Sequence, residues 1–153
     1  MSLALAHALE LPGKLRLDKA SYIAVQTIYY PGFTIAGAFG EGLGMLATLG
    51  LLIMTGTGGP KFPWILVALV ALILMHALYW IITHPVNKFW MKDQHLEGLG
   101  AGFFSVGKRG CELTKADPEE VWRRLRNRWE YSHLVRAVFA GIALIALSVA
   151  LAI

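Results

Sequence analysis

A few ionisable side chains interrupt the apolar stretches of this 153-residue chain, at positions where they could carry chemistry. Glu41 lies within a long apolar run, where an ionisable group is costly in a bilayer and is a candidate functional group by default. The alternative is a protonated or hydrogen-bonded carboxyl that only holds helices together. His76 and His84 are eight residues apart, so on a helix they share one face with Trp80. This row could ligate a metal or haem, transfer protons, or bond to a neighbouring helix, and the spacing leaves these interpretations open.

A second row of aromatic and polar side chains leads into the last apolar run, at spacings that place its members on one helix face: Trp122, Trp129, His133 and Arg136. The two tryptophans are typical of anchors at a membrane interface. Arg136 falls just below the lipid headgroups, where a cation needs a carboxylate, a phosphate or a bound anion as its partner. The alternative is that Arg136 snorkels to the lipid phosphates and His133 faces the headgroups.

Depth along the expected helices brings the ionisable side chains into the same half of the membrane. The predicted cluster consists of Glu41, His76, His84, His133 and Arg136. These residues come from three helices, and we expect them to form a polar pocket in an apolar wall. Such a pocket, open toward the cytoplasmic interface, is suited to a lipophilic small molecule.

The elements that must position these residues are membrane helices. The mean hydropathy is +0.55 and 16% of the residues are charged, against about 25% in typical soluble domains. The single cysteine, Cys111, excludes an internal disulfide and a multi-cysteine metal site within this chain. The net charge of +4 does not require a nucleic-acid partner, because membrane proteins concentrate Lys and Arg in their cytoplasmic loops. The sequence therefore predicts an integral membrane protein whose first partner is the lipid bilayer.

Three segments are long and apolar enough to cross a bilayer: 31–55, 63–83 and 133–153. We expect 1–30 to be a surface or tilted lead-in and Pro85 to end the second span. Asp117 and Pro118 fit the first positions of a helix that continues into the third span. Gly40 and Gly44 have the spacing that lets membrane helices approach closely.

The prediction is an all-α membrane domain over 1–153, a bundle of three transmembrane helices. The apolar segment 96–107 is too short to cross and is predicted to be a fourth, re-entrant or interfacial element. Most Lys and Arg residues lie in 84–132, which places this loop and the N-terminus in the cytoplasm. We expect a bacterial inner (plasma) membrane location.

Two segments resemble signatures of a known family. THPVNKFW (83–90) is similar to a Pro-x-Asn element after a membrane helix, and WRRLRNRWEYSHLVR (122–136) is similar to a Trp-x(6)-Trp-x(3)-His-x-x-Arg element before the last helix. Both are signatures of the anthrone oxygenase-like family of small polytopic membrane proteins, many of unknown function. The resemblance implies a compact four-helix bundle and, in anthrone oxygenases, oxidation of a hydrophobic polyphenol by dioxygen without an obvious cofactor. The positions that it carries over are Asn87, Trp129, His133 and Arg136.

The predicted function is a small membrane oxidoreductase for a lipophilic aromatic or quinone-like substrate at the cytoplasmic side of the bilayer. His133 or His76 would take a phenolic proton, Arg136 would stabilise the anion, and Glu41 would hold or relay protons. The predicted substrate-binding residues are His84, Asn87 and Trp129. No metal and no cofactor are predicted, and haem between His76 and His133 is the alternative.

A second hypothesis is a non-catalytic accessory subunit of a larger membrane complex. The small size, the basic loop and the glycine-rich helix faces fit this hypothesis equally well.

Overall fold

The computed structural model describes residues 2–90 and 117–153, and within them every regular element is helical. The elements are α1 (Ser2–Lys14), α2 (Lys19–Thr55), α3 (Phe62–Leu78), the π-helical η1 (Tyr79–Thr83), α4 (His84–Trp90) and α6 (Pro118–Ala152). Three stretches are long and apolar enough to cross a membrane: Ile35–Thr55, Phe62–Asn87 and Pro118–Ala152. The predicted all-α membrane fold with three such helices is confirmed. The predicted fourth element at 96–107 lies outside the described residues.

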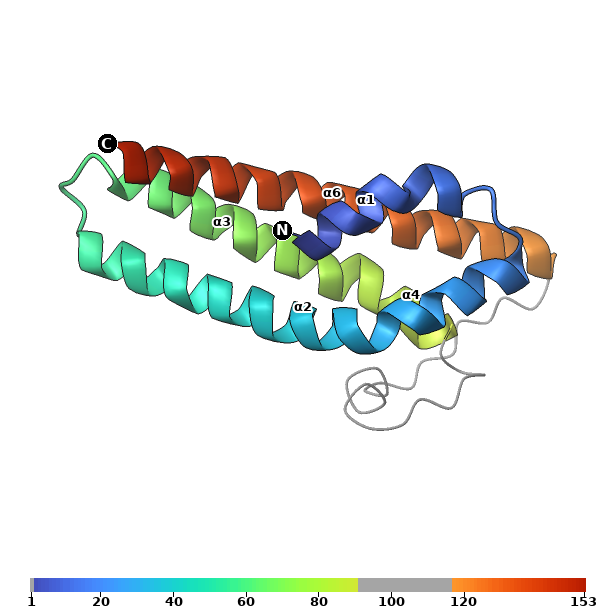
Figure 1. Ribbon diagram of the computed structural model, residues 1–153. Coiled ribbons are helices and arrows are strands. Elements are labelled where there is room, and N and C mark those ends of the chain that lie inside the picture. Colours follow the sequence, from blue (N-terminus) through green and yellow to red (C-terminus); the bar gives the residue numbers. More distant parts are fainter. Residues whose placement is uncertain (1, 91–116) are drawn as a thin grey trace.

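The helices run nearly side by side, as Figure 1 shows, with α3 antiparallel to both α2 and α6. The contact between α3 and α6 is built from alanines, with Ala68 and Ala71 against Ala143 and Ala146. Small side chains let helix backbones approach closely where lipid supplies no hydrophobic drive for association. The N-terminal helix α1 packs against α6 and adds a further helix to the bundle.

Helix α2 is continuous from Lys19 to Thr55, so the expected boundary between a lead-in and a span at residue 31 is not a break. Its first turn is capped by Asp18, whose carboxylate accepts the Ser21 N–H at 2.7 Å. Figure 1 shows α2 bending in its first half, the part that contains Pro31. A proline inside a helix removes one backbone hydrogen bond and is a common cause of such a bend.

The glycines of α2 do not make the close helix contacts that their spacing predicts. A Cβ atom added at Gly40, Gly42 or Gly44 would meet nothing within 4 Å in the described part of the chain. These glycines therefore make no close contact with another helix in the described part of the chain. Of the Ile35–Thr55 span, 6% is buried inside the structure, against 28% for each of the other two spans.

The prediction that Pro85 ends the second span is wrong, because the chain stays helical to Trp90. The helix accommodates the proline through the wider π-helical turn η1, in which the His84 N–H donates to the Tyr79 carbonyl. Pro85 has no N–H to offer the Ile81 carbonyl four residues earlier. That carbonyl instead accepts Nη2 of Arg128 on α6 at 3.4 Å.

The junction between η1 and α4 is also held by α6, since the Thr83 and Ser132 hydroxyls are 2.8 Å apart.

The long helix α6 begins as predicted. Asp117 accepts the Glu119 N–H at 3.0 Å, and Pro118 takes the first helical position. The helix then continues without a break to Ala152, which carries its polar face along η1 and α1.

Candidate functional site

A cavity opens between α1, α2, the η1 region and α6, with an empty volume of about 710 Å³ that includes its open mouth. The lining side chains are Leu3, Ala4, His7, Gln26, Tyr29, Phe33, Gly37, Ala38, Glu41, His76, Tyr79, Thr83, Asn87, Trp129, His133 and Arg136. Most of the α2 members are spaced three or four residues apart, so one face of that helix forms one wall.

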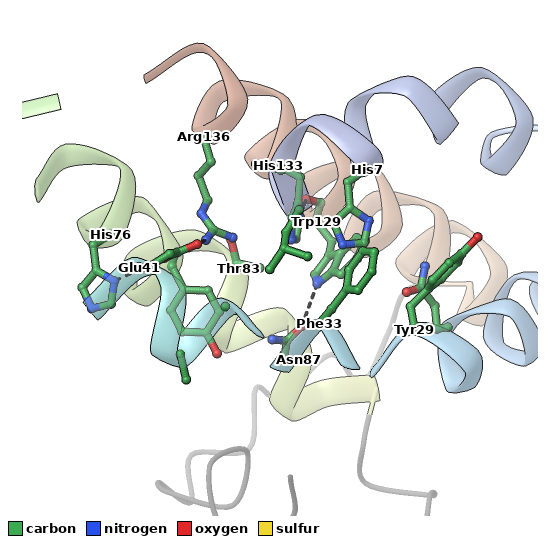
Figure 2. A pocket seen from close by; sticks show the side chains of 16 residues that line it. His7, Tyr29, Phe33, Glu41, His76, Thr83, Asn87, Trp129, His133 and Arg136 are labelled. Atoms are coloured by element: carbon green, nitrogen blue, oxygen red, sulfur yellow. Dashed lines mark hydrogen bonds and ion pairs between the residues drawn. The ribbon is translucent and has the colours of Figure 1, made fainter. Parts of the chain in front are cut away.

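At one side of the cavity, Glu41 binds Arg136 through a hydrogen-bonded ion pair between Oε1 and Nη2 (Figure 2). The Arg136 side chain is 7% exposed and that of Glu41 is 17% exposed. Arg136 therefore points into the bundle rather than out to lipid phosphates. A buried cation and carboxylate compensate each other's desolvation. Of the three partners that the sequence left open for Arg136, a carboxylate, a phosphate or a bound anion, the structure shows a carboxylate.

His76 lies beside this pair, with Nδ1 3.4 Å from Oε2 of Glu41. Its other nitrogen, Nε2, accepts the indole N–H of Trp80 at 2.9 Å. An indole nitrogen can only donate, so a neutral His76 carries its proton on Nδ1 and directs it at Glu41. The predicted trio of Glu41, His76 and Arg136 is thus brought together, with His76 toward the outside of the bundle.

His133 lies one helical turn before Arg136 on α6 and is 6% exposed. Its Nδ1 is 3.0 Å from the Trp129 carbonyl oxygen, which can only accept. The neutral ring therefore has its proton on Nδ1 and its lone pair on Nε2. The ring packs on that of Trp129, with centroids 4.1 Å apart, and lines the cavity.

The remaining predicted residues separate into two groups. Asn87 and Trp129 both line the cavity, and the Trp129 indole donates to Oδ1 of Asn87 at 2.6 Å. His84 is buried against the rings of Trp80 and Tyr79, and it is not among the side chains that line the cavity. The structure thus brings six of the seven predicted residues to one cavity, and their roles stay predictions.

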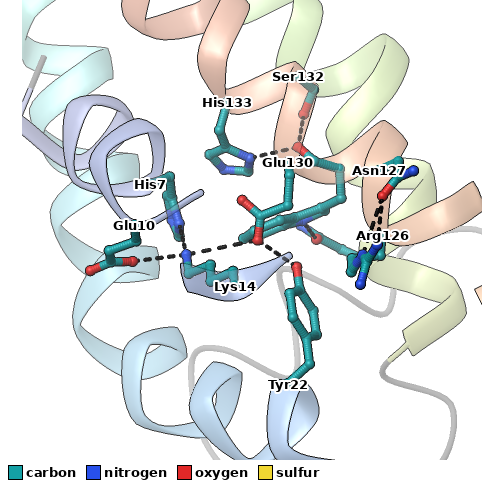
Figure 3. A network of polar contacts seen from close by, with 11 residues as sticks. His7, Glu10, Lys14, Tyr22, Arg126, Asn127, Glu130, Ser132 and His133 are labelled. Atoms are coloured by element: carbon teal, nitrogen blue, oxygen red, sulfur yellow. Dashed lines mark hydrogen bonds and ion pairs between the residues drawn. The ribbon is translucent and has the colours of Figure 1, made fainter. Parts of the chain in front are cut away.

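Sequence reasoning missed the contribution of α1. His7 lines the cavity, and its Nδ1 is 2.8 Å from Nζ of the buried Lys14. Lys14 also pairs with Glu10 at 2.8 Å and lies 3.8 Å from Glu130, which accepts the Tyr22 hydroxyl at 2.7 Å (Figure 3). Glu130 is 1% exposed, so these charges are held inside the helix bundle.

The electrostatic surroundings keep His7 neutral. Burial, followed by the positive charges of Lys14 and Arg136, lowers the pKa of the His7 imidazole to about 3. The sequence does contain a pattern that indicates a buried position for α1. His7, Glu10 and Lys14 are spaced by three and four residues, so they form a polar stripe on a short apolar helix. The same stripe also fits a helix that lies on a membrane surface, and that was the expectation for this segment.

Neither metal nor haem ligation is favoured by the geometry of the described residues. Within 2–90 and 117–153, no group of three or more His, Cys, Asp or Glu side chains is placed to hold a metal ion. A haem iron held between His76 and His133 would need one nitrogen on each ring that is not already engaged by another side chain. Both nitrogens of His76 already have partners in Glu41 and Trp80.

A comparison with protein-family models decides the family. The model described as anthrone oxygenase matches residues 27–146, which is most of the chain. The chain belongs to the anthrone oxygenase family. The resemblance based on the two sequence signatures is therefore confirmed, and the family indicates an oxygenase or oxidoreductase type of role. Searches among curated proteins and among solved structures found no match.

The segment matched to the anthrone oxygenase family contains most of the cavity lining. It includes Glu41, His76, Asn87, His133 and Arg136. His7 and Gln26 precede the matched segment, although both line the same cavity. In this member of the anthrone oxygenase family, the α1 side of the cavity is thus described by the structure and not by the family match.

Proposed function

We propose that this chain is a small membrane oxidoreductase that oxidises a lipophilic aromatic or quinone-like substrate with dioxygen, as the family description implies. One observation carries the proposal: an inward-facing arginine–glutamate pair and an enclosed histidine with an open Nε2 share one aromatic-walled cavity. The aromatic side chains that line the cavity suit a flat aromatic molecule.

His133 is the proposed general base. A base needs a lone pair within reach of the substrate, and the bond from Nδ1 to the Trp129 carbonyl leaves that lone pair on Nε2. His76 fits a different role, because its Nε2 accepts from Trp80 and its proton points at Glu41. We assign His76 and Glu41 to holding and relaying protons next to the base.

Arg136 is the proposed stabiliser of the substrate anion. Removal of a proton from a phenol, or from a ring carbon next to a carbonyl, leaves negative charge on an oxygen of the substrate. A guanidinium offers several N–H donors in a fixed plane, so Arg136 can keep one on Glu41 while another binds that oxygen. Its Nε is buried and has no hydrogen-bond partner among the described residues.

The proposed reaction is balanced without a further reductant. An activated ring CH₂ group loses two hydrogens and four electrons as it becomes a carbonyl. Dioxygen accepts the four electrons, one of its atoms enters the new carbonyl, and the other leaves as water with the two hydrogens. The residues of this chain would supply proton removal, charge stabilisation and a water-poor site, and the proposal includes no resident cofactor.

The membrane orientation is part of the proposal. The positive-inside rule supports a cytoplasmic N-terminus in a bacterial inner membrane, with the cavity nearer the cytoplasmic face. A lipophilic substrate would then enter from the bilayer or from that interface.

The test is turnover of anthrone to anthraquinone by the purified full chain in lipid nanodiscs, followed by absorbance. His133→Gln removes the base and is expected to lower the rate by about 10²–10⁴-fold. Ser148→Ala changes the same helix away from the cavity, at a hydroxyl bonded to the Leu144 carbonyl, and should leave the rate unchanged. Equal rates for wild type and His133→Gln would refute His133 as the base.

The accessory-subunit hypothesis is favoured by a different observation, the open space beside three glycines of α2. Gly40, Gly42 and Gly44 have open space beside them in the described part of the chain, and a second membrane protein could cover them. Purification in mild detergent separates the hypotheses. A stoichiometric polypeptide together with no turnover supports the accessory role, whereas turnover by the chain alone supports the enzyme.

A further inference from the structure

Gln26 is a buried polar side chain that the proposed chemistry does not use. It lies on the cavity-lining face of α2, one turn before Tyr29, and is 4% exposed. Its Nε2 has no hydrogen-bond partner among the described residues. A buried amide N–H without an acceptor costs on the order of 1–3 kcal/mol, so a bound molecule that supplies an acceptor would recover this energy.

His7 presents a second donor to the same cavity. Because the Lys14 ammonium can only donate, Nδ1 of His7 must accept at their 2.8 Å contact. The neutral ring therefore carries its proton on Nε2. The low pKa of His7, about 3, keeps the ring neutral across the physiological range.

The charged groups next to His7 at the α1 side of the cavity do not line the cavity. Lys14, Glu10 and Glu130 compensate one another through contacts of 2.8 and 3.8 Å, and none of the three is among the lining residues. A ligand on this side thus meets neutral donors and no ion. Neutral donors suit the oxygen of a carbonyl group, whereas the side with Arg136 suits an anion.

Aromatic walls connect the two sides. The Phe33 ring lies 5.0 Å from that of His7 and 5.3 Å from that of Tyr29. Trp129 closes the opposite wall, with its ring 4.9 Å from that of His7. Such walls favour a flat aromatic body that extends from Arg136 toward α1 (Figure 2).

We infer that Gln26 and His7 form a second, neutral subsite at the α1 side of the cavity, which binds a carbonyl oxygen of the flat aromatic substrate. This inference rests on the proposed function and adds a second point of contact to it: Arg136 binds one oxygen of the substrate beside Glu41, and a second carbonyl oxygen is held at the α1 side.

The experiment compares three ligands of similar shape, anthracene, anthrone and anthraquinone, which carry no, one and two carbonyl groups. Binding to the full chain in nanodiscs is measured by quenching of tryptophan fluorescence, with empty nanodiscs correcting for partition into lipid. Gln26→Leu keeps a similar volume and removes the donor. It should weaken binding of anthraquinone, which carries a second carbonyl, roughly tenfold. Binding of anthracene should be unchanged, and so should binding of anthrone, because its single oxygen is the one assigned to Arg136.

Two further variants control the comparison. Thr27→Val changes the next residue of α2, an exposed side chain bonded to the Ala24 carbonyl, and should not alter any of the three affinities. Gln26→Glu keeps the shape but replaces the donor with an acceptor, so it should weaken binding of anthraquinone at least as much as Gln26→Leu does.

The outcomes separate the subsite from the proposed function. Equal weakening of all three ligands, or no weakening, would overturn the subsite while wild-type binding and turnover leave the proposed function standing. If the wild-type chain binds none of the three ligands, the proposed function fails and the subsite fails with it.

Discussion

Two buried polar clusters of this protein are built from similar residues but face the cavity differently. In the first, Glu41 and Arg136 present their charges to the cavity itself, and His76 lines the cavity beside Glu41. In the second, Lys14 and Glu130 are screened from it by His7. A buried ion pair by itself is weak support for stability, because desolvation offsets most of the attraction. We therefore propose that the first cluster serves chemistry and that the second attaches α1 to the bundle.

The largest expected effect concerns the first cluster. Arg136→Gln leaves the Glu41 carboxylate without its partner, which should lower the free energy of unfolding by about 3–5 kcal/mol and abolish turnover. The double variant Glu41→Gln/Arg136→Gln removes both charges and should regain most of the stability but none of the turnover. Chemical denaturation and anthrone turnover measure the two properties. A double variant with normal turnover would show that this pair is only structural.

A smaller effect is expected in the second cluster. Glu130→Gln removes a charge that lies near Lys14 and accepts the Tyr22 hydroxyl, so the free energy of unfolding should fall by about 1–3 kcal/mol. Turnover of the folded fraction should stay near that of wild type, because Glu130 does not line the cavity.

Glu119→Gln is the matched control on the same helix. Its exposed pair with Arg123, at 3.3 Å, should contribute at most about 1 kcal/mol. If Glu130→Gln instead loses turnover and keeps its stability, the second cluster also serves chemistry, and the proposed difference between the two clusters is wrong.

The pH dependence of stability gives the smallest expected effect. The pKa of His7 is lowered to about 3 in the folded state, so below its unfolded value near 6.5 the unfolded chain binds the proton more readily. The stabilisation by neutral His7 is therefore complete above about pH 6.5 and is lost as the pH falls toward 3. At pH 5 the loss is on the order of 2 kcal/mol. His7→Gln should flatten this part of a stability–pH profile measured by denaturation, and an unchanged slope would assign it to another group.

The sequence predicted the parts of the site that depend on the cost of burying charge. Arg136 and Glu41 lie in apolar runs, where each needs a partner, and this need made both residues candidates. Solvation left two directions open for Arg136, and its pair with Glu41 inside the bundle decides between them. The start of α6 was equally predictable, because Asp117 and Pro118 are local signals that need no tertiary contact.

Other parts were not predictable, because they depend on contacts between distant segments. The chain passes Pro85 as a helix because Arg128, far along the sequence, supplies a donor to the Ile81 carbonyl. The polar stripe of α1 fits a membrane surface and a helix bundle equally well until α6 provides Glu130 as a partner. Gln26 carries no charge, so nothing in the sequence indicates that its amide is buried and that its Nε2 has no hydrogen-bond partner in the described part of the chain.

The most direct test of the proposed catalytic role is oxygen uptake by the purified wild-type chain in nanodiscs on addition of anthrone. An oxygen electrode and absorbance would be read together, with empty nanodiscs as the blank. The proposed chemistry predicts uptake above the blank, with one dioxygen consumed for each anthraquinone formed. Uptake equal to that of empty nanodiscs, from a folded preparation, would contradict the assignment of this cavity as an oxidising active site.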